Sequence, residues 1–101
     1  MKEIKVSYDS DFKVLIGNDK SQSAIMVLPP KEKEGGPDNK HDHSDQWLYV
    51  ISGKGEATIN GKDVELPAGC LILIEKGDTH EIRNTGEVNL NTINFYIPPE
   101  Y

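Results

Sequence analysis

The stretch GEATINGKDVEL, residues 55 to 66, carries the clearest β-hairpin signal in the sequence. Apolar and polar side chains alternate on both sides of Asn60-Gly61, which predicts two strands that each bury one face. A two-residue type I′ turn needs a positive φ at both central residues, and asparagine and glycine accept this conformation best. We therefore predict an antiparallel hairpin with its turn at Asn60-Gly61.

Short apolar runs of the same kind continue in both directions from the hairpin. Turn residues separate them every roughly eight to twelve positions, which is typical of an all-β sandwich or barrel. No stretch has a sustained helical period with caps, so no helix is predicted. The predicted strands are residues 12–17, 21–29, 39–43, 46–52, 55–60, 62–67, 70–75, 80–84 and 89–97.

The length of the chain limits it to one domain with one core. It has 101 residues, of which 36% are hydrophobic, so a single globular domain over residues 1–101 is expected. The formal net charge of -6 would repel nucleic acid and anionic membranes, and we expect neither as a partner. The apolar runs are too short to span a bilayer and no secretory leader is recognisable, so a cytoplasmic location is expected.

Two further stretches each have a structural and a functional interpretation. Residues 29–40 are rich in proline, glycine and charge, which favours a solvated connector, with a mobile lip over a pocket as the alternative. Cys70 is the only cysteine, which excludes an intramolecular disulfide. Within its apolar run it is expected to be a small buried hydrophobe rather than a reactive thiol.

Two of the three histidines stand one residue apart in the stretch HDHSDQW, residues 41–47. Successive side chains of a strand point to opposite faces, so His41 and His43 would point the same way and could converge on one ion. Gln46 has the wrong parity to join them on a continuous strand. A bend at Ser44-Asp45 would reset the phase and turn Gln46 inward.

The third histidine begins another predicted strand. His80 follows a tight turn at Gly77-Asp78 and shares a strand face with Ile82 and Asn84, because side chains two apart point the same way. A helical zinc-protease motif would need histidines four residues apart, and Asn84 stands where the second would be. Histidines at two strand starts favour a metal site, with incidental or structural histidines as the alternative.

Strand parity also predicts the outward side chains. Leu48 and Val50 would continue the inward face of Gln46. Trp47, Tyr49 and Ile51 would then form the opposite face, which we expect to pack against a second sheet or a second subunit.

The last predicted strand has one apolar and one polar face, and the apolar face is predicted to be the inner wall. Tyr101, beyond that strand, is expected either to pack on the mouth of the barrel or to fray. The apolar face consists of Ile93, Phe95 and Ile97, and the polar face consists of Thr92, Asn94 and Tyr96.

The spacing of these residues resembles the two sequence motifs of the cupin superfamily. The first motif, G-x5-HxH-x3-4-E-x6-G, is similar to GGPDNKHDHSDQWLYVISG at residues 35–53. The second, G-x5-PxG-x2-H-x3-N, is similar to GCLILIEKGDTHEIRN at residues 69–84. The matching positions are Gly35, His41, His43, Gln46 and Gly53 in the first motif, and Gly69, Gly77, His80 and Asn84 in the second.

The resemblance implies a double-stranded β-helix, or jelly-roll barrel, that holds a divalent transition metal. The ligands it implies are His41, His43, Gln46 and His80, a set that suits Zn, Ni, Cu, Fe, Co or Mn. Gln46 replaces the glutamate of the family, one residue early, and Glu75 replaces its proline. An amide leaves the ion more positive and cannot act as a general base, and no other base is identifiable.

Two functions are compatible with such a site. The first is a metal-dependent enzyme for a small polar metabolite, either a Lewis-acid isomerase like the sugar and uronate isomerases among the cupins or a dioxygenase. The second is a non-catalytic cupin that binds or senses a small ligand, since fold alone does not fix function. The small core, the aromatic face at Trp47 and Tyr49, and the resemblance to cupins favour a homodimer.

Overall fold

The computed structural model describes all residues, 1–101, and contains nine strands and no helix. Five strands form one sheet in the order β1-β2-β9-β4-β7, and four form a second sheet in the order β3-β8-β5-β6. All pairings are antiparallel. The strands are β1 (Phe12–Gly17), β2 (Gln22–Leu28), β3 (Lys33–Gly35), β4 (Asp45–Ser52), β5 (Gly55–Ile59), β6 (Lys62–Leu66), β7 (Leu71–Ile74), β8 (His80–Asn84) and β9 (Leu90–Ile97).

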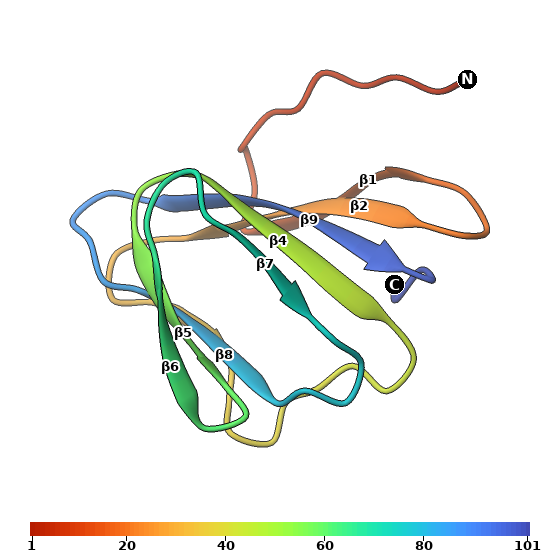
Figure 1. The fold of residues 1–101 in the computed structure, drawn as a ribbon. Coiled ribbons are helices and arrows are strands. Elements are labelled where there is room, and N and C mark those ends of the chain that lie inside the picture. The colour runs from red at the N-terminus through yellow and green to blue at the C-terminus, as the bar shows by residue number, and fades with distance from the viewer.

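The two sheets face one another, and the chain crosses between them repeatedly (Figure 1). Alternate side chains of the strands fill the space between the sheets, as period-two patterning requires. The largest core side chains come from both layers, so the sheets share one hydrophobic core. Its fully buried members include Leu48, Val50, Ala57, Leu66, Ile74, Ile82 and Leu90.

The predicted hairpin is confirmed. β5 and β6 pair with Thr58 opposite Asp63, and the turn residues Asn60 and Gly61 have φ values of 51° and 81°. These are the positive angles that a type I′ turn requires. Asn60 also anchors the neighbouring loop, because its Oδ1 accepts a hydrogen bond of 3.0 Å from the backbone N–H of Thr79.

The strand predicted at residues 39–43 is wrong. The third strand is β3, inside the segment interpreted as a connector, where Lys33 pairs with Arg83 of β8. Residues 36–44 form a loop instead. Long-range backbone bonds hold this loop in place: His80 N–H donates to Asn39 O at 2.9 Å, and Gly77 N–H donates to His41 O at 2.8 Å.

The predicted inner wall of the last strand is also wrong, because β9 faces the other way. Gln46, Leu48 and Val50 of β4 are buried as predicted. Directly paired residues of antiparallel strands share a sheet face, so the partners of these three on β9 face inward too. These partners are Tyr96, Asn94 and Thr92, which are 2%, 0% and 0% exposed.

The outer face of the five-stranded sheet is therefore apolar. Trp47, Tyr49 and Ile51 lie there as strand parity predicted, but no second sheet covers them, and each is 37% to 42% exposed. Cys70 is half-buried against the core rather than fully buried. No helix of the structure is long and apolar enough to cross a membrane, and the cytoplasmic location stays a prediction.

Candidate metal and ligand pocket

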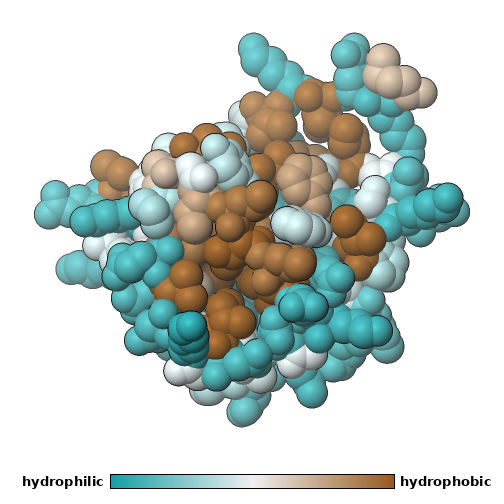
Figure 2. Space-filling model, in the orientation of Figure 1, coloured by the Kyte–Doolittle hydropathy of each residue, from teal (hydrophilic) through white to brown (hydrophobic).

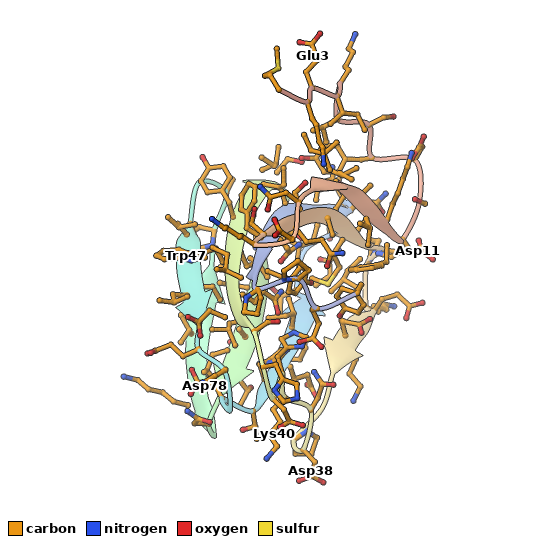
Figure 3. All side chains as sticks on the ribbon, turned by 90° about the vertical axis from the view of Figure 1, so that its right-hand side faces the viewer. Glu3, Asp11, Asp38, Lys40, Trp47 and Asp78 are labelled. Carbon is orange, nitrogen blue, oxygen red and sulfur yellow. The ribbon has the colours of Figure 1, made fainter.

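A small pocket opens between the two sheets at the end of the sandwich where the histidine loops lie. Figure 3 shows Asp38 and Lys40 of the loop before His41 at this end, and Glu3 of the N-terminal arm at the opposite end. The cavity has a volume of about 190 Å³. It is lined by Phe12, Met26, Glu34, Asn39, His41, Gln46, His80, Ile82, Tyr96 and Tyr101.

A larger cavity of about 570 Å³ lies elsewhere, between the N-terminal arm and the outer face of β1, β2 and β9. None of its lining residues is a histidine, a carboxylate or a cysteine. The smaller pocket is therefore the candidate functional site, because His41, Gln46 and His80 all line it.

His41 and Gln46 lie against one another in the pocket. His41 Nε2 is 2.9 Å from Gln46 Oε1, and the His41 ring centroid is 5.0 Å from that of His80. The bend at Ser44-Asp45 places Gln46 at the start of β4 and turns it inward, as the sequence predicted. Ser44 is itself buried, and its hydroxyl donates to Pro98 O at 2.7 Å.

A chain of hydrogen bonds fixes the orientation of the Gln46 amide. The Thr92 hydroxyl donates to Met26 O at 2.9 Å, and Asn94 Nδ2 donates to Thr92 Oγ1 at 3.0 Å. Asn94 Oδ1 is then an acceptor, and Gln46 Nε2 donates to it at 2.8 Å. Gln46 therefore presents its carbonyl oxygen, and not its NH₂ group, to the pocket.

The outer nitrogen of His41 lies beside a carboxylate. Glu100 Oε1 is 3.1 Å from His41 Nδ1. This oxygen is buried and the contact is not aligned as a hydrogen bond, so it has no hydrogen-bond partner. Oxygen atoms thus face both ring nitrogens of His41. Both Nε2 and Gln46 Oε1 can present lone pairs to each other. Either a hydrogen on Nε2 or a metal ion therefore has to lie between the two atoms.

His80 also lines the pocket, but its Nε2 is occupied by the side chain of Asn39. Its Nδ1 lies 3.2 Å from Asp78 O, which only accepts, and its Nε2 lies 3.2 Å from Asn39 Nδ2, which only donates. These partners select the tautomer with the proton on Nδ1 and a lone pair on Nε2. Burial lowers the pKa of His80, which favours this neutral form.

The spacing of His41 and Gln46 is compatible with two ligands of one metal ion. Ligating histidines donate their outer N–H to a carboxylate or a backbone carbonyl. Asp78 O lies at this position for His80, and Glu100 lies beside His41 Nδ1 without a hydrogen bond. Two ligands roughly 2.1 Å from one ion and at right angles to each other lie roughly 3 Å apart. The separation of 2.9 Å between His41 Nε2 and Gln46 Oε1 matches this spacing.

His43, the fourth predicted ligand, does not line the pocket and is exposed. Strand parity placed it beside His41, but residues 41–43 lie in the loop, where that parity does not apply. No group of three or more histidine, cysteine, aspartate or glutamate side chains that could hold a metal is present. The third donor of the cluster is instead the amide oxygen of Gln46.

Several pocket residues were missed by sequence reasoning. Glu34 belongs to the segment interpreted as a connector, and Asn39 to the strand that does not form. Tyr96 and Asn94 were assigned to the outer face. The signal that could have found Tyr96 and Asn94 is the polar side chain at every second position of the last strand. A buried amide such as Gln46 needs a buried hydrogen-bond partner, which favours the polar face of that strand as the inner one.

Aromatic side chains form the mouth of the pocket. Tyr101 packs edge-on against Tyr96 and Phe12, with ring centroids 5.1 Å and 4.9 Å apart. The Gln22 side chain holds the backbone of Tyr101, accepting from its N–H at 2.9 Å and donating to its O at 2.7 Å. Of the two expectations for Tyr101, packing at the mouth is confirmed. Burial raises the pKa of both Tyr96 and Tyr101.

Two facing antiparallel sheets, with His41 of a loop and His80 of β8 between them at one end, are the arrangement of double-stranded β-helix proteins. The chain belongs to the cupin family, because the model of the cupin domain matches residues 24–96. The predicted fold class is confirmed by a crystal structure of a Bacillus halodurans protein, which is 27% identical with a TM-score of 0.85, over 91% of this chain and 73% of that one.

Two further matches, one by sequence and one by structure, come from Thermotoga maritima. One is an oxalate-binding protein that is 37% identical over 67 residues, which are 66% of this chain. These residues cover 54% of that protein, so the chain spans about half its length. The other is the crystal structure of a predicted oxalate decarboxylase, 30% identical with a TM-score of 0.77, over 87% of this chain and 79% of that one.

Proposed function

We propose that this cupin binds a divalent transition metal through His41, Gln46 and His80 and uses it to bind a small carboxylate. The observation that carries the proposal is the 2.9 Å separation of His41 Nε2 and Gln46 Oε1 in a pocket that the His80 ring also lines, with its centroid 5.0 Å from that of His41. Zn, Ni, Cu, Fe, Co and Mn remain candidates, because two imidazoles and an amide oxygen do not select among them.

The neutral ligand set favours an anionic ligand. Two neutral imidazoles and an amide cancel none of the charge of a divalent ion, so its full charge is available to attract a carboxylate. Without the ion, the carboxylates of Glu34 and Glu100 beside the pocket would repel an anion. Anion binding should therefore depend on metal.

The size of the pocket favours a ligand of few atoms. A water molecule takes roughly 30 Å³ of liquid volume, and the cavity of about 190 Å³ thus has room for about six. An ion with a dicarboxylate of two to four carbons is of this scale. The names of the Thermotoga maritima matches, oxalate-binding protein and predicted oxalate decarboxylase, support the same chemical class.

The test is elemental analysis of untagged protein followed by calorimetric titration with oxalate. We expect one transition metal per chain, oxalate binding to the loaded protein, and none after chelation. Metal-free protein that cannot be loaded would contradict the metal site. Equal binding of oxalate with and without metal would contradict the role of the ion.

Catalysis is the second candidate, and Glu34 favours it. This carboxylate lines the pocket and makes no hydrogen bond or ion pair, so it is available as the general base that Gln46 cannot be. The ion, when bound, would supply Lewis acidity. Glu34 would take a proton from the carbon beside the carbonyl group of a hydroxy-keto acid and return it to the carbonyl carbon, while the hydroxyl proton moves to the carbonyl oxygen, so that the isomerisation has no net proton change. Glu34→Gln should abolish turnover of such an acid and leave metal content unchanged, whereas unchanged turnover would exclude Glu34 as the base.

A further inference from the structure

The segment that follows β9 lies across the mouth of the pocket. We define the strap as residues 98–101, which turn back after β9 so that this end of the chain lies near the start of β4 (Figure 1). The Ser44 hydroxyl holds the beginning of the strap by donating to Pro98 O at 2.7 Å. Tyr101, at the other end of the strap, lines the pocket itself.

We infer that Tyr101 determines how large a molecule can reach His41, and that it thereby sets the length of the carboxylate that the pocket accepts. The class of ligand rests on the proposed function. The control of access to His41 does not, because it depends only on where the Tyr101 ring lies.

The ring of Tyr101 covers the mouth. Its centroid lies 4.9 Å from that of Phe12, 5.1 Å from that of Tyr96 and 6.4 Å from that of His41. All three contacts are edge-on, at distances that aromatic pairs prefer. Tyr101 is 61% exposed, whereas the His41 side chain is 11% exposed. The Tyr101 ring therefore has solvent on one side and the pocket on the other.

The strap is held less firmly than the rest of the mouth. Phe12 belongs to β1 and Tyr96 to β9, and the backbones of both strands pair with β2. No backbone–backbone hydrogen bond joins residues 98–101 to the sheets. The strap can therefore move without breaking a strand pairing, and segments of this kind open most easily. Tyr101 is the part of the mouth that can change the size of the opening.

One side chain holds the strap over the pocket. Gln22 Oε1 accepts hydrogen bonds from the N–H groups of Glu100 at 3.2 Å and Tyr101 at 2.9 Å. Gln22 Nε2 donates to Tyr101 O at 2.7 Å. An amide offers the acceptor and the donor that these bonds need at the same time. Gln22 is fixed by the pairing of β2 with β9, so it fixes the position of the Tyr101 ring as well.

The position of the ring sets a limit on ligand size. A molecule bound beside His41 and Gln46 has to fit within about 190 Å³, and Tyr101 is part of the boundary of that volume. Removal of the ring would open the mouth and leave the two inner side chains in place. One methylene group too many changes recognition by about 10- to 200-fold in a closed pocket. Replacement of Tyr101 should therefore shift the preference between short and long dicarboxylates.

The first test measures access without any ligand. Diethyl pyrocarbonate modifies accessible imidazoles, and mass spectrometry after chelation of any metal gives a rate for each histidine. His43 is exposed and serves as the internal reference. We expect His41 to react more slowly than His43 in the wild-type protein. Tyr101→Ala and Gln22→Ala should each raise the ratio of the His41 rate to the His43 rate several-fold.

The second test measures the length of the ligand. Calorimetric titration of the metal-loaded protein compares oxalate with adipate, a dicarboxylate of six carbons. Tyr101→Ala should raise the affinity for adipate relative to oxalate by at least about 10-fold, and Tyr101→Phe, which keeps the ring, should restore the wild-type ratio. The matched control is Tyr49→Ala, which removes a tyrosine from the outer face of β4. Figure 2 shows the apolar side chains gathered on the face that β4 and β7 present.

The two tests separate this inference from the proposed function. An unchanged His41 rate in both Tyr101→Ala and Gln22→Ala, or an equal increase in Tyr49→Ala, would overturn the control of access. Oxalate binding with the same adipate-to-oxalate ratio in Tyr101→Ala would overturn the role in ligand length and leave the proposed function standing. If neither acid binds but the His41 rate responds to Tyr101, the proposed function fails and the control of access is supported. Circular dichroism establishes that each variant is folded.

Discussion

On β4 and β9 the inner face carries buried polar side chains and the outer face carries exposed apolar ones, the reverse of what burial alone would favour. The inner face carries Gln46 and Asn94, which are 4% and 0% exposed, whereas the outer face carries Trp47 and Phe95, which are 37% and 41% exposed. The inner polar groups are hydrogen-bonded to one another, so their burial is not penalised. The difference teaches that a partner, rather than polarity, decides which face is buried.

The largest expected effect is a loss of metal affinity when a histidine of the pocket is replaced, compared with the exposed His43. Replacing His41 or His80 by alanine should lower metal affinity more than about 100-fold, since loss of an outer-shell partner alone costs 10- to 100-fold. His43→Ala is the matched control and should retain the metal because His43 is exposed. Elemental analysis and metal competition measure this, and loss of metal in His43→Ala would return that residue to the ligand set.

A second pair of variants compares apolar side chains on the two sides of the sandwich. Ile82→Ala, at a core position 1% exposed, should lower the free energy of unfolding by about 2–5 kcal/mol. Leu71→Ala, 56% exposed, should cost about 1 kcal/mol or less under conditions that keep the protein monomeric. Urea unfolding measures both, and equal costs would mean that the outer face is buried in the monomer.

The buried amide pair can be broken directly. Asn94→Leu should cost about 1–3 kcal/mol, because it leaves the Gln46 NH₂ group buried without an acceptor. Replacing both partners, Gln46→Leu with Asn94→Leu, should recover part of that loss. If the double variant is as unstable as the sum of the single ones, the two side chains are not coupled.

The smallest expected effect is the dependence of stability on pH. Burial lowers the pKa of His80 in the folded state, so below about pH 6.5 the unfolded chain binds a proton that the folded one does not. Stability of the metal-free protein should then fall as pH decreases, by at most about 1.4 kcal/mol per pH unit. His80→Gln should have a shallower slope, although His41, Asp78 and Glu34 also act on His80. An unchanged slope would contradict the prediction.

Most of the fold could be predicted from local patterns, because strands and turns are encoded by neighbouring residues. The hairpin at Asn60-Gly61 and the phase reset at Ser44-Asp45 are of this kind, and eight of the nine predicted strands form. Of the predicted ligands, the structure brings His41, Gln46 and His80 together in the pocket.

The remaining features depend on contacts between distant residues. The loop with His41 and His43 follows backbone bonds to Gly77 and His80, and no local pattern encodes these bonds. The orientation of β9 depends on Asn94 meeting Gln46, which are 48 residues apart in the sequence. Neither partner reveals the other without knowledge of the strand pairing.

The hydrogen-bond chain behind Gln46 couples the choice of metal ligand to a backbone carbonyl two strands away. Met26 O can only accept, so Thr92, Asn94 and Gln46 each have their donor and acceptor fixed in turn. A glutamate at position 46 would place a second acceptor against Asn94 Oδ1. Thr92 and Asn94 therefore favour an amide over a carboxylate at position 46.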